Sequence, residues 1–360
     1  MIDLPKFMSD NLQGLVQTAY RSVLSNPREA AFAMRFMRSL SKGEKRRKQL
    51  MDSGLEVPPF LICSIASTCN LSCAGCYARK TGIASDEPTR KMLDASAWER
   101  IFGEASGLGF NVALLAGGEP LTRRDVLDVA AKTKDMLFPV FTNGTMIGAV
   151  YTDFFRRNPN VVPVVSLEGD SGATDSRRGE GVYRRAVAGM EMLRDAGVFY
   201  GTSITVTTEN KERVTSEEYL GWLRSMGCKL LFYVEYVPID EGTEHLAFGD
   251  DDVLWMERRL EELRGVFGDM LFVSFPGDEK MLGGCMAAGR GFFHIGPDGA
   301  AEPCPFSPHS DTNAATDGLE AALRSPLFRK LRDASALSWQ HTGGCTLYEH
   351  RDEVEAMVGA

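Results

Sequence analysis

The sequence predicts an α/β fold in which helices cover a parallel sheet. Between residues 58 and 268, six apolar runs alternate with six stretches of helical periodicity. Strands that are apolar throughout and separated by helices are typical of a parallel sheet that is buried on both faces. Six such units form either an open doubly wound sheet or an incomplete (β/α)6 barrel. Both architectures bind ligands at the carboxyl ends of their strands.

The boundaries of these elements are predicted at the positions where β-rich segments give way to segments of helical periodicity. The predicted strands are Phe60–Ala66, Val112–Ala116, Leu137–Thr142, Val161–Leu167, Val198–Thr207 and Leu230–Val237. The predicted helices are Ala95–Ser106, Arg124–Met136, Met146–Arg157, Tyr183–Asp195, Ser216–Met226 and Asp251–Arg264.

Segments of different character flank this region. Residues 1–57 have the periodicity of amphipathic helices, with Phe32, Phe36 and Leu40 repeating at intervals of four residues. The basic run 42–48 suits a solvated helix end, or a patch for a membrane surface or an acidic partner. The alternation stops at about residue 268, and the Gly- and Pro-rich segment Phe275–Pro308 follows. We therefore predict three parts, 1–57, 58–268 and 269–360, of which the last is a small appended module with a helical stretch at Leu319–Asp333.

Composition excludes some classes of function. The 360 residues carry 40 Lys and Arg against 49 Asp and Glu, and a net charge of −9 argues against nucleic-acid binding. No apolar run reaches the length of a transmembrane segment, and no secretory signal is recognisable at the N-terminus. We expect a cytoplasmic protein. In that reducing compartment, clustered cysteines are more often metal ligands or catalytic groups than disulfides.

Three of the eight cysteines lie in the loop after the first predicted strand. Cys69, Cys73 and Cys76 have the spacing C-x3-C-x2-C. Three thiolates in one short loop can bind three irons of a [4Fe–4S] cluster and leave the fourth iron open. A structural zinc site needs four ligands, and the nearest further cysteine, Cys63, belongs to the strand. The spacing therefore favours an iron–sulfur cluster over zinc or unliganded thiols.

This loop, with the aromatic Tyr77 directly after Cys76, resembles the signature of the radical S-adenosylmethionine (radical SAM) superfamily. The resemblance implies an incomplete (β/α)6 barrel in which the open iron of the [4Fe–4S] cluster binds S-adenosyl-L-methionine. Reductive cleavage of that molecule gives a 5′-deoxyadenosyl radical, which abstracts hydrogen from the substrate. The electron would come from a donor such as flavodoxin or ferredoxin.

Further motifs match this family at the ends of the next strands. Gly117, Gly118, Glu119 and Pro120 resemble the GGEP element that faces the methionine ammonium group, and Asn143 belongs to a TNG turn. The alternative for Asn143 is an ordinary Asn-Gly turn. Ser166 and Arg178 resemble a pair that contacts the methionine carboxylate and the ribose. Arg177 could take the place of Arg178, and Thr205–Thr207 with Asn210 resemble a loop on the cofactor side.

The C-terminal part resembles the SPASM/twitch extension of this superfamily, which carries auxiliary clusters. Its cysteines are Cys285, Cys304 and Cys345, too few for two clusters, so the resemblance implies one auxiliary [4Fe–4S] cluster. The fourth iron is either open to substrate or bound by one of four side chains: His341, His294, Glu349 or His350. Cys63 and Cys228 are predicted core residues.

The substrate is the least constrained part of the prediction. Tyr233 and Glu235 alternate near the end of the sixth strand and are candidate substrate-side, catalytic groups on one face. We favour a peptide or protein side chain as the substrate. The alternatives are small-molecule or cofactor biosynthesis, acting on carbohydrates, nucleotides or tetrapyrroles, and a non-catalytic iron–sulfur electron carrier or redox sensor. This last class would not need the GGEP element, Ser166 or Arg178.

Overall fold

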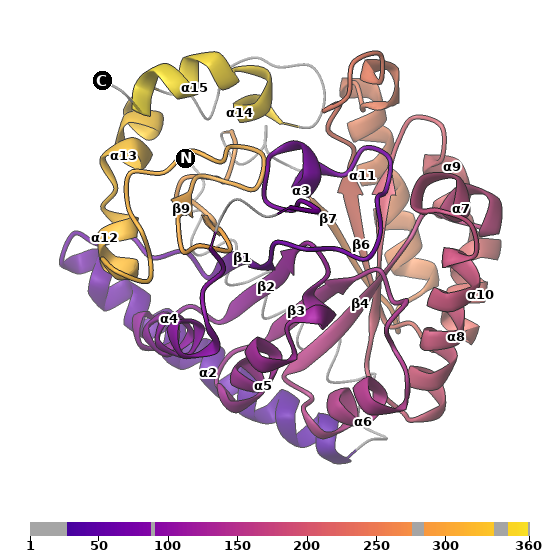
Figure 1. The fold of residues 1–360 in the computed structure, drawn as a ribbon. Coiled ribbons are helices and arrows are strands. Elements are labelled where there is room, and N and C mark those ends of the chain that lie inside the picture. Colours follow the sequence, from indigo (N-terminus) through magenta and orange to yellow (C-terminus); the bar gives the residue numbers. More distant parts are fainter. Residues whose placement is uncertain (1–26, 88–90, 276–283, 335–344, 359–360) are drawn as a thin grey trace.

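The fold is built on one curved, mainly parallel sheet (Figure 1). The computed structural model describes residues 27–87, 91–275, 284–334 and 345–358. Neighbouring strands follow the order β7-β6-β5-β4-β3-β2-β1-β8-β9, and every pair from β7 to β8 is parallel. The strands are β1 (Phe60–Ala66), β2 (Val112–Gly117), β3 (Phe138–Thr142), β4 (Val161–Leu167), β5 (Gly201–Val206), β6 (Leu230–Glu235), β7 (Leu271–Phe275), β8 (His294–Ile295) and β9 (Ala301–Glu302).

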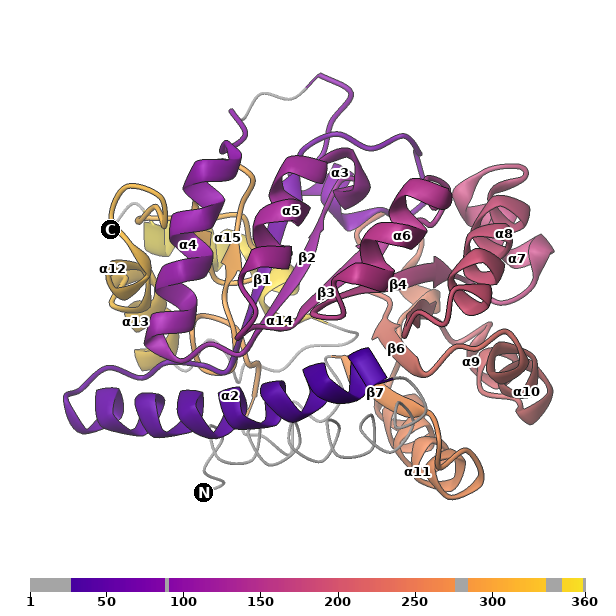
Figure 2. The ribbon, with the colours of Figure 1, turned by 90° about the horizontal axis from the view of Figure 1, so that it is seen from below.

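Helices cover the outer side of the sheet (Figures 1 and 2). The helices that connect the strands are α3 (Tyr77–Lys80), α4 (Ala95–Leu108), α5 (Arg124–Lys132), α6 (Ala149–Arg157), α7 (Ser171–Arg178), α8 (Val182–Asp195), α9 (Lys211–Val214), α10 (Glu217–Ser225) and α11 (Asp250–Val266). Their buried residues, such as Trp98, Phe102 and Leu223, form one hydrophobic core with the outward-facing side chains of the strands.

All six predicted strand–helix units are present, and the predicted α/β fold with a parallel sheet is confirmed. The sheet is larger than predicted, because β7 adds a seventh parallel strand beyond residue 268 and β8 pairs with the other edge at β1. The sheet therefore does not end at the predicted boundary. Five- and two-residue strands are too short for a periodicity to stand out from a Gly- and Pro-rich segment.

Helix α2 (Pro27–Asp52) runs across the amino ends of the strands (Figure 2). Phe36 and Leu40 are buried against Val112 at the start of β2, as expected for the apolar face of an amphipathic helix. The part of the predicted amphipathic region that precedes α2, residues 1–26, lies outside the described residues.

The basic run 42–48 has a partly structural role. Arg47 is buried and donates to the Asn111 side chain at 2.7 Å and to the carbonyl of Gly109, which ends α4, while Arg46 donates to the carbonyl of Gly107. These two arginines satisfy carbonyls at the end of α4 that have no partner within the helix. Burial lowers the pKa of Arg47 to about 10, with Glu44 opposing the shift.

The C-terminal segment closes the gap between the two edges of the sheet. The Phe292 ring stacks on Phe60 of β1 at 5.3 Å and contacts Phe275 of β7 at 5.4 Å between ring centroids. His294 on β8 bonds Ser64 of β1 through Nε2 at 2.7 Å and Glu302 of β9 through Nδ1 at 2.6 Å, with all three side chains buried. These contacts fix the segment to the barrel.

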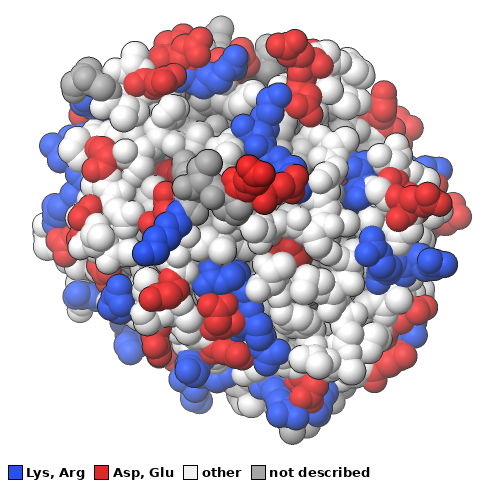
Figure 3. All heavy atoms as spheres, viewed as in Figure 1, with Lys and Arg blue, Asp and Glu red and all other residues white. Residues whose placement is uncertain are grey.

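The remaining helices pack beside β8 and β9. They are α12 (Leu319–Leu323), α13 (Pro326–Asp333), α14 (Thr346–Glu349) and α15 (Arg351–Val358). The predicted single stretch Leu319–Asp333 is two helices, because Ser325 caps a new helix whose first residue is Pro326. In the described ranges, no helix is long and apolar enough to span a membrane. The face in Figure 3 carries acidic and basic side chains interspersed, with no dominant single-sign field.

Candidate active site

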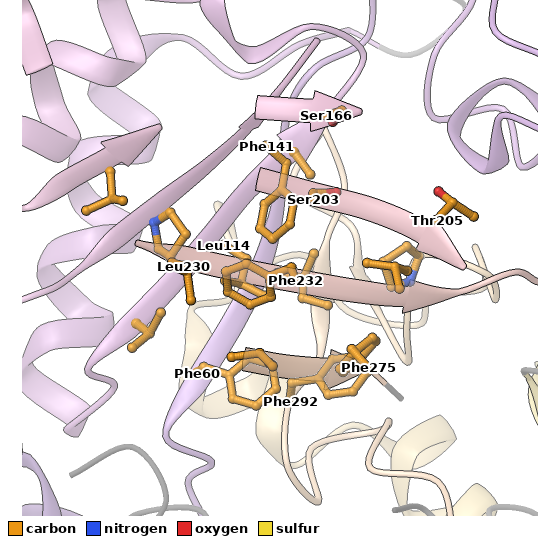
Figure 4. A pocket seen from close by; sticks show the side chains of 18 of the residues that line it. Phe60, Leu114, Phe141, Ser166, Ser203, Thr205, Leu230, Phe232, Phe275 and Phe292 are labelled. Carbon is orange, nitrogen blue, oxygen red and sulfur yellow. The ribbon is translucent and has the colours of Figure 1, made fainter. Parts of the chain in front are cut away.

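A cavity of about 610 Å³ occupies the inside of the barrel. It reaches from Phe32, Ala33 and Phe36 of α2 to the carboxyl ends of the strands. The inward-facing side chains are largely apolar, and Phe141 and Phe232 contact each other from β3 and β6 at 5.1 Å between ring centroids (Figure 4). The polar groups lie at the carboxyl ends, where Ser166, Ser203 and Thr205 project from β4 and β5.

The loop after β1 brings Cys69, Cys73 and Cys76 to this cavity. All three are half-buried. Burial raises the pKa of the Cys69 thiol, a backbone hydrogen bond from Leu71 opposes the rise, and the charges of Glu119, Cys73 and Cys76 add to it. Across the described part of the chain, no three His, Cys, Asp or Glu side chains converge closely enough to bind a single metal ion. Three thiols in one short loop can serve as ligands of a cluster with several irons.

Gly117 and Gly118 allow the second strand to approach this loop closely. A Cβ atom on Gly118 would lie 2.0 Å from the Thr68 carbonyl oxygen, and one on Gly117 would lie 2.4 Å from the Ala66 oxygen. Gly117 also has a φ of +114°, which L side chains rarely adopt. The Gly118 and Glu119 N–H groups donate to Ala66 and Thr68 at 2.7 and 2.8 Å. The glycines are therefore required by the contact between β2 and the start of the cysteine loop.

Glu119 is buried, and both of its carboxylate oxygens accept hydrogen bonds. Oε1 accepts from Leu121 N at 3.0 Å and Thr142 Oγ1 at 2.7 Å, and Oε2 accepts from Asn143 N at 2.9 Å. Burial raises the pKa of Glu119, although these hydrogen bonds and the charge of Arg178 oppose the rise. Pro120 begins the short 3-10 helix Pro120–Thr122 beside it. The result is a fixed carboxylate on the cavity wall that is complementary to a cation.

Asn143 belongs to the same network. Its side chain donates to Asn70 in the cysteine loop at 2.8 Å and accepts from Thr145 N and Thr145 Oγ1 at 3.0 and 2.6 Å. The turn after β3 thus has the Asn-Gly geometry of an ordinary turn and also links the loops after β1 and β2.

At the end of β4, Ser166 lines the cavity, and two adjacent arginines bind one buried carboxylate. Glu168 Oε1 accepts from Arg178 Nε and Nη2 at 2.8 and 2.5 Å, and from Arg177 Nη1 at 2.5 Å. Both arginines line the cavity, so the two alternatives from the sequence are not exclusive. Glu168 is not among the site residues predicted from the sequence. A Glu directly after a strand, followed nine and ten residues later by two Arg, is a sequence pattern that could have indicated this ion pair.

Of the two candidate substrate-side residues, Tyr233 and Glu235, only one reaches the cavity. Glu235 lines the cavity, but Tyr233 does not, and its hydroxyl donates to the Val214 carbonyl at 2.9 Å. The placement of Tyr233 as a substrate-side group is therefore wrong. Tyr233 points toward α9, whereas Glu235, the last residue of β6, reaches the cavity. In the loop after β5, Asn210 donates to Thr205 O and accepts from Thr207 N. These hydrogen bonds stabilise that loop.

Cys285, Cys304 and Cys345 are buried and line the same cavity. A hydrogen bond with Cys345 raises the pKa of Cys304 well above its usual range, and burial and the nearby Cys285 add to the rise. The three thiols are thus neighbours although they come from distant parts of the chain. Tyr77, directly after Cys76, contacts Phe306 at 5.2 Å between ring centroids and so joins the two cysteine groups.

The four candidate fourth ligands have different outcomes. His294 is excluded, because Ser64 and Glu302 occupy both of its ring nitrogens. Glu349 and His350 are absent from the described wall of the cavity, and His350 is 3.4 Å from Glu353. His341 lies outside the described residues.

Comparison with known proteins agrees with this geometry. The family model described as the Radical SAM superfamily matches residues 63–218, which include the cysteine loop and strands β2 to β5. An AdoMet-dependent heme synthase from Methanosarcina barkeri is 27% identical over 320 residues, which cover 82% of this chain and 89% of that protein. An Fe-coproporphyrin III synthase from the same organism is 26% identical over 185 residues, 51% of this chain and 45% of that protein.

Among solved structures, SuiB from Streptococcus suis bound to its precursor peptide SuiA has a similar fold. Its TM-score is 0.65 at 19% sequence identity, and the match covers 86% of this chain and 74% of that chain. The family match includes the cysteine loop, and the similarity to SuiB extends to the fold. Within residues 63–218, the chain is similar to the radical SAM superfamily.

Proposed function

We propose that this protein is a radical SAM enzyme that carries one auxiliary [4Fe–4S] cluster and acts on a tetrapyrrole. The observation that supports this proposal best is the single cavity, which has both cysteine groups and a largely apolar, aromatic wall. A substrate in this cavity would contact both metal sites at once.

Cys69, Cys73 and Cys76 would hold a [4Fe–4S] cluster, which with S-adenosyl-L-methionine would supply a radical able to abstract hydrogen from a bound substrate. Glu119 suits the ammonium group of that molecule, because it is a fixed and buried carboxylate. Ser166 and Arg178 suit its carboxylate or ribose. Arg178 uses Nε and Nη2 for Glu168, which leaves Nη1 for such a contact. Tyr77 limits the space beside the last cysteine of the loop.

The auxiliary cluster is proposed at Cys285, Cys304 and Cys345. Their burial and mutual proximity favour a shared role over three independent core thiols. The cavity reaches these residues, so a fourth iron without a protein ligand would face a substrate. One-electron reduction of either cluster requires an external donor, and flavodoxin or ferredoxin fits that requirement.

A tetrapyrrole accounts for the cavity better than the peptide that the sequence analysis favours. A large, flat and mostly apolar macrocycle suits a wall built from Phe141, Phe232, Phe275 and Phe292. A relative matched over most of both chains is named as a heme synthase. The similarity to SuiB is at a level of identity that reports on the fold alone.

The test compares candidate substrates on the reconstituted protein. Iron-coproporphyrin and short peptides are titrated separately, and binding is followed by the porphyrin Soret band or by peptide fluorescence. With S-adenosyl-L-methionine and dithionite present, a tetrapyrrole substrate should also raise the yield of 5′-deoxyadenosine. Phe232→Ala should weaken porphyrin binding, while the exposed-site control Leu254→Ala should not. Peptide-dependent 5′-deoxyadenosine without porphyrin binding would reject the tetrapyrrole and restore the peptide.

A further inference from the structure

Arg177 connects the cysteine loop to the ends of two strands. Its Nε donates to the Ala74 carbonyl at 3.2 Å, and its own carbonyl accepts from Ala74 N at 2.9 Å. The same guanidinium donates through Nη1 to Glu168 and Thr205, at 2.5 and 2.6 Å. One side chain thus links the loop after β1 with the ends of β4 and β5.

The linked segment is the part of the loop between Cys73 and Cys76. Ala74 and Gly75 are the only residues between these cysteines, and Arg177 Nη2 also approaches the Gly75 carbonyl at 3.5 Å. Gly75 has a φ of +63°, and a Cβ atom there would lie 3.1 Å from the Tyr236 ring. The segment is therefore held between Arg177 and Tyr236.

Arg177 also contributes charge near the cysteines. Its side chain is 22% exposed and that of Glu168 is 4% exposed, so the ion pair is only partly screened by solvent. Glu168 binds two arginines, which leaves a net positive charge beside Cys73. A positive charge near an iron–sulfur cluster stabilises the reduced state, because reduction adds negative charge.

We propose that Arg177 is a positioning residue of the cysteine loop, which sets the relative placement of Cys73 and Cys76 and raises the reduction potential of the cluster that they bind. This inference rests on the proposed cluster at that loop. It assigns to Arg177 a role distinct from that of Arg178, which lines the cavity but makes no described hydrogen bond to the loop.

The test measures the potential of the cluster in the full-length, reconstituted protein. Dithionite titration is followed by electron paramagnetic resonance, with and without S-adenosyl-L-methionine, and the signal that responds to this molecule identifies the N-terminal cluster. Arg177→Gln should lower the potential of that cluster and leave the other cluster unchanged. Arg177→Lys retains the positive charge and should restore the wild-type reduction potential. Its resonance spectrum should still differ from that of the wild type, because an ammonium group cannot replace the planar guanidinium that donates to both the loop and the strand ends.

Two further variants separate positioning from general damage. Thr205→Val removes the hydrogen-bond acceptor for Arg177 on β5. It should alter the resonance spectrum in the same way as Arg177→Gln, with little effect on the reduction potential. The control Arg213→Gln removes an exposed guanidinium that pairs with Asp170, and should match the wild type. Equal potentials and spectra in Arg177→Gln, Arg213→Gln and wild type would overturn the inference. A wild type without any signal that responds to S-adenosyl-L-methionine would instead reject the proposed function, and with it the cluster that Arg177 is inferred to position.

Discussion

At the scale of single residues, Glu119 places a buried carboxylate on the cavity wall. Its carboxylate is buried and bonded to three neutral donors, and the nearest opposing charge is that of Arg178. A buried carboxylate is expensive unless a cation is close to it. A ligand with an ammonium group would therefore gain from this residue both a contact and charge compensation.

Replacing Glu119 with Gln should weaken binding of S-adenosyl-L-methionine about tenfold to a hundredfold, the equivalent of one charge-assisted contact of about 1.5–3 kcal/mol. Iron content should not change, because Glu119 is not a cluster ligand. Equilibrium dialysis of the reconstituted protein gives the dissociation constant. The exposed Glu99→Gln in α4 is the control. A wild-type constant in the Glu119 variant would contradict the assignment.

The raised pKa of Glu119 has a consequence for stability in the absence of ligand. The folded state then holds a proton that the unfolded state releases at lower pH. Stability is therefore fully present below the unfolded pKa of Glu and is lost as pH rises through the folded pKa. The wild type should lose stability relative to Glu119→Gln over that range, by at most about 1.4 kcal/mol per pH unit. Urea unfolding of both proteins at a series of pH values measures the difference, and a constant difference would contradict the raised pKa.

At the scale of elements, the cysteine loop should be separable from the C-terminal cysteines. Replacing Cys69, Cys73 and Cys76 together with Ala should abolish cleavage of S-adenosyl-L-methionine and remove about half of the iron. The loop is half-buried and lies at a strand end, so the fold should tolerate these changes. Iron analysis and chromatography of 5′-deoxyadenosine measure both effects. Cleavage at the wild-type rate would exclude the loop as the site of reduction.

The pairing of β8 with β1 depends on one histidine. His294→Ala removes a buried side chain that bonds both Ser64 and Glu302, so we expect the free energy of unfolding to fall by about 3 kcal/mol or more. The exposed His245→Ala should change it by less than about 0.5 kcal/mol. Chemical denaturation with matched slopes gives both values. A small effect at His294 would mean that the aromatic contacts of Phe292 alone hold the segment.

Elements were predictable where their signal is local. The six strands are apolar runs between turn residues, and the sequence locates each of them to within three residues at either end. The cysteine loop and the GGEP turn follow from strand order, because parallel strands bring their carboxyl ends to one edge. The position of Tyr233 was not predictable, since its hydroxyl bonds the distant Val214 carbonyl, and the two bonds of His294 depend on a non-local strand pairing.

At the scale of the whole molecule, the hollow barrel could not be read from the sequence. An apolar inward-facing side chain such as Phe141 or Phe232 has the same pattern in a filled barrel as in a hollow one. On β4 and β5, the cavity wall carries the small side chains of Ser166 and Ser203. The convergence of Cys285, Cys304 and Cys345 is likewise a product of chain topology.

The expected number of iron–sulfur clusters follows from the number of cysteine thiols that can bind iron. Besides the loop cysteines, only Cys285, Cys304 and Cys345 line the cavity, whereas Cys63 and Cys228 are fully buried in the core. Two auxiliary four-iron clusters would need about eight ligands, and three thiolates suit one. Anaerobically reconstituted protein should therefore contain about eight irons per chain, four at each site.

The same measurement on variants assigns these irons to their sites. Replacing Cys285, Cys304 and Cys345 together with Ala should reduce the count to about four and leave cleavage of S-adenosyl-L-methionine measurable, because the loop cysteines remain. The core variant Cys228→Ala should retain about eight, since its thiol bonds Thr202 inside the barrel wall. If the C-terminal cluster has a protein ligand at its fourth iron, His341→Ala should change its spectrum, whereas an open iron should give the wild-type spectrum. A reproducible count of about twelve in the wild type would require ligands beyond these cysteines, and a count of about four would mean that the C-terminal thiols bind no cluster.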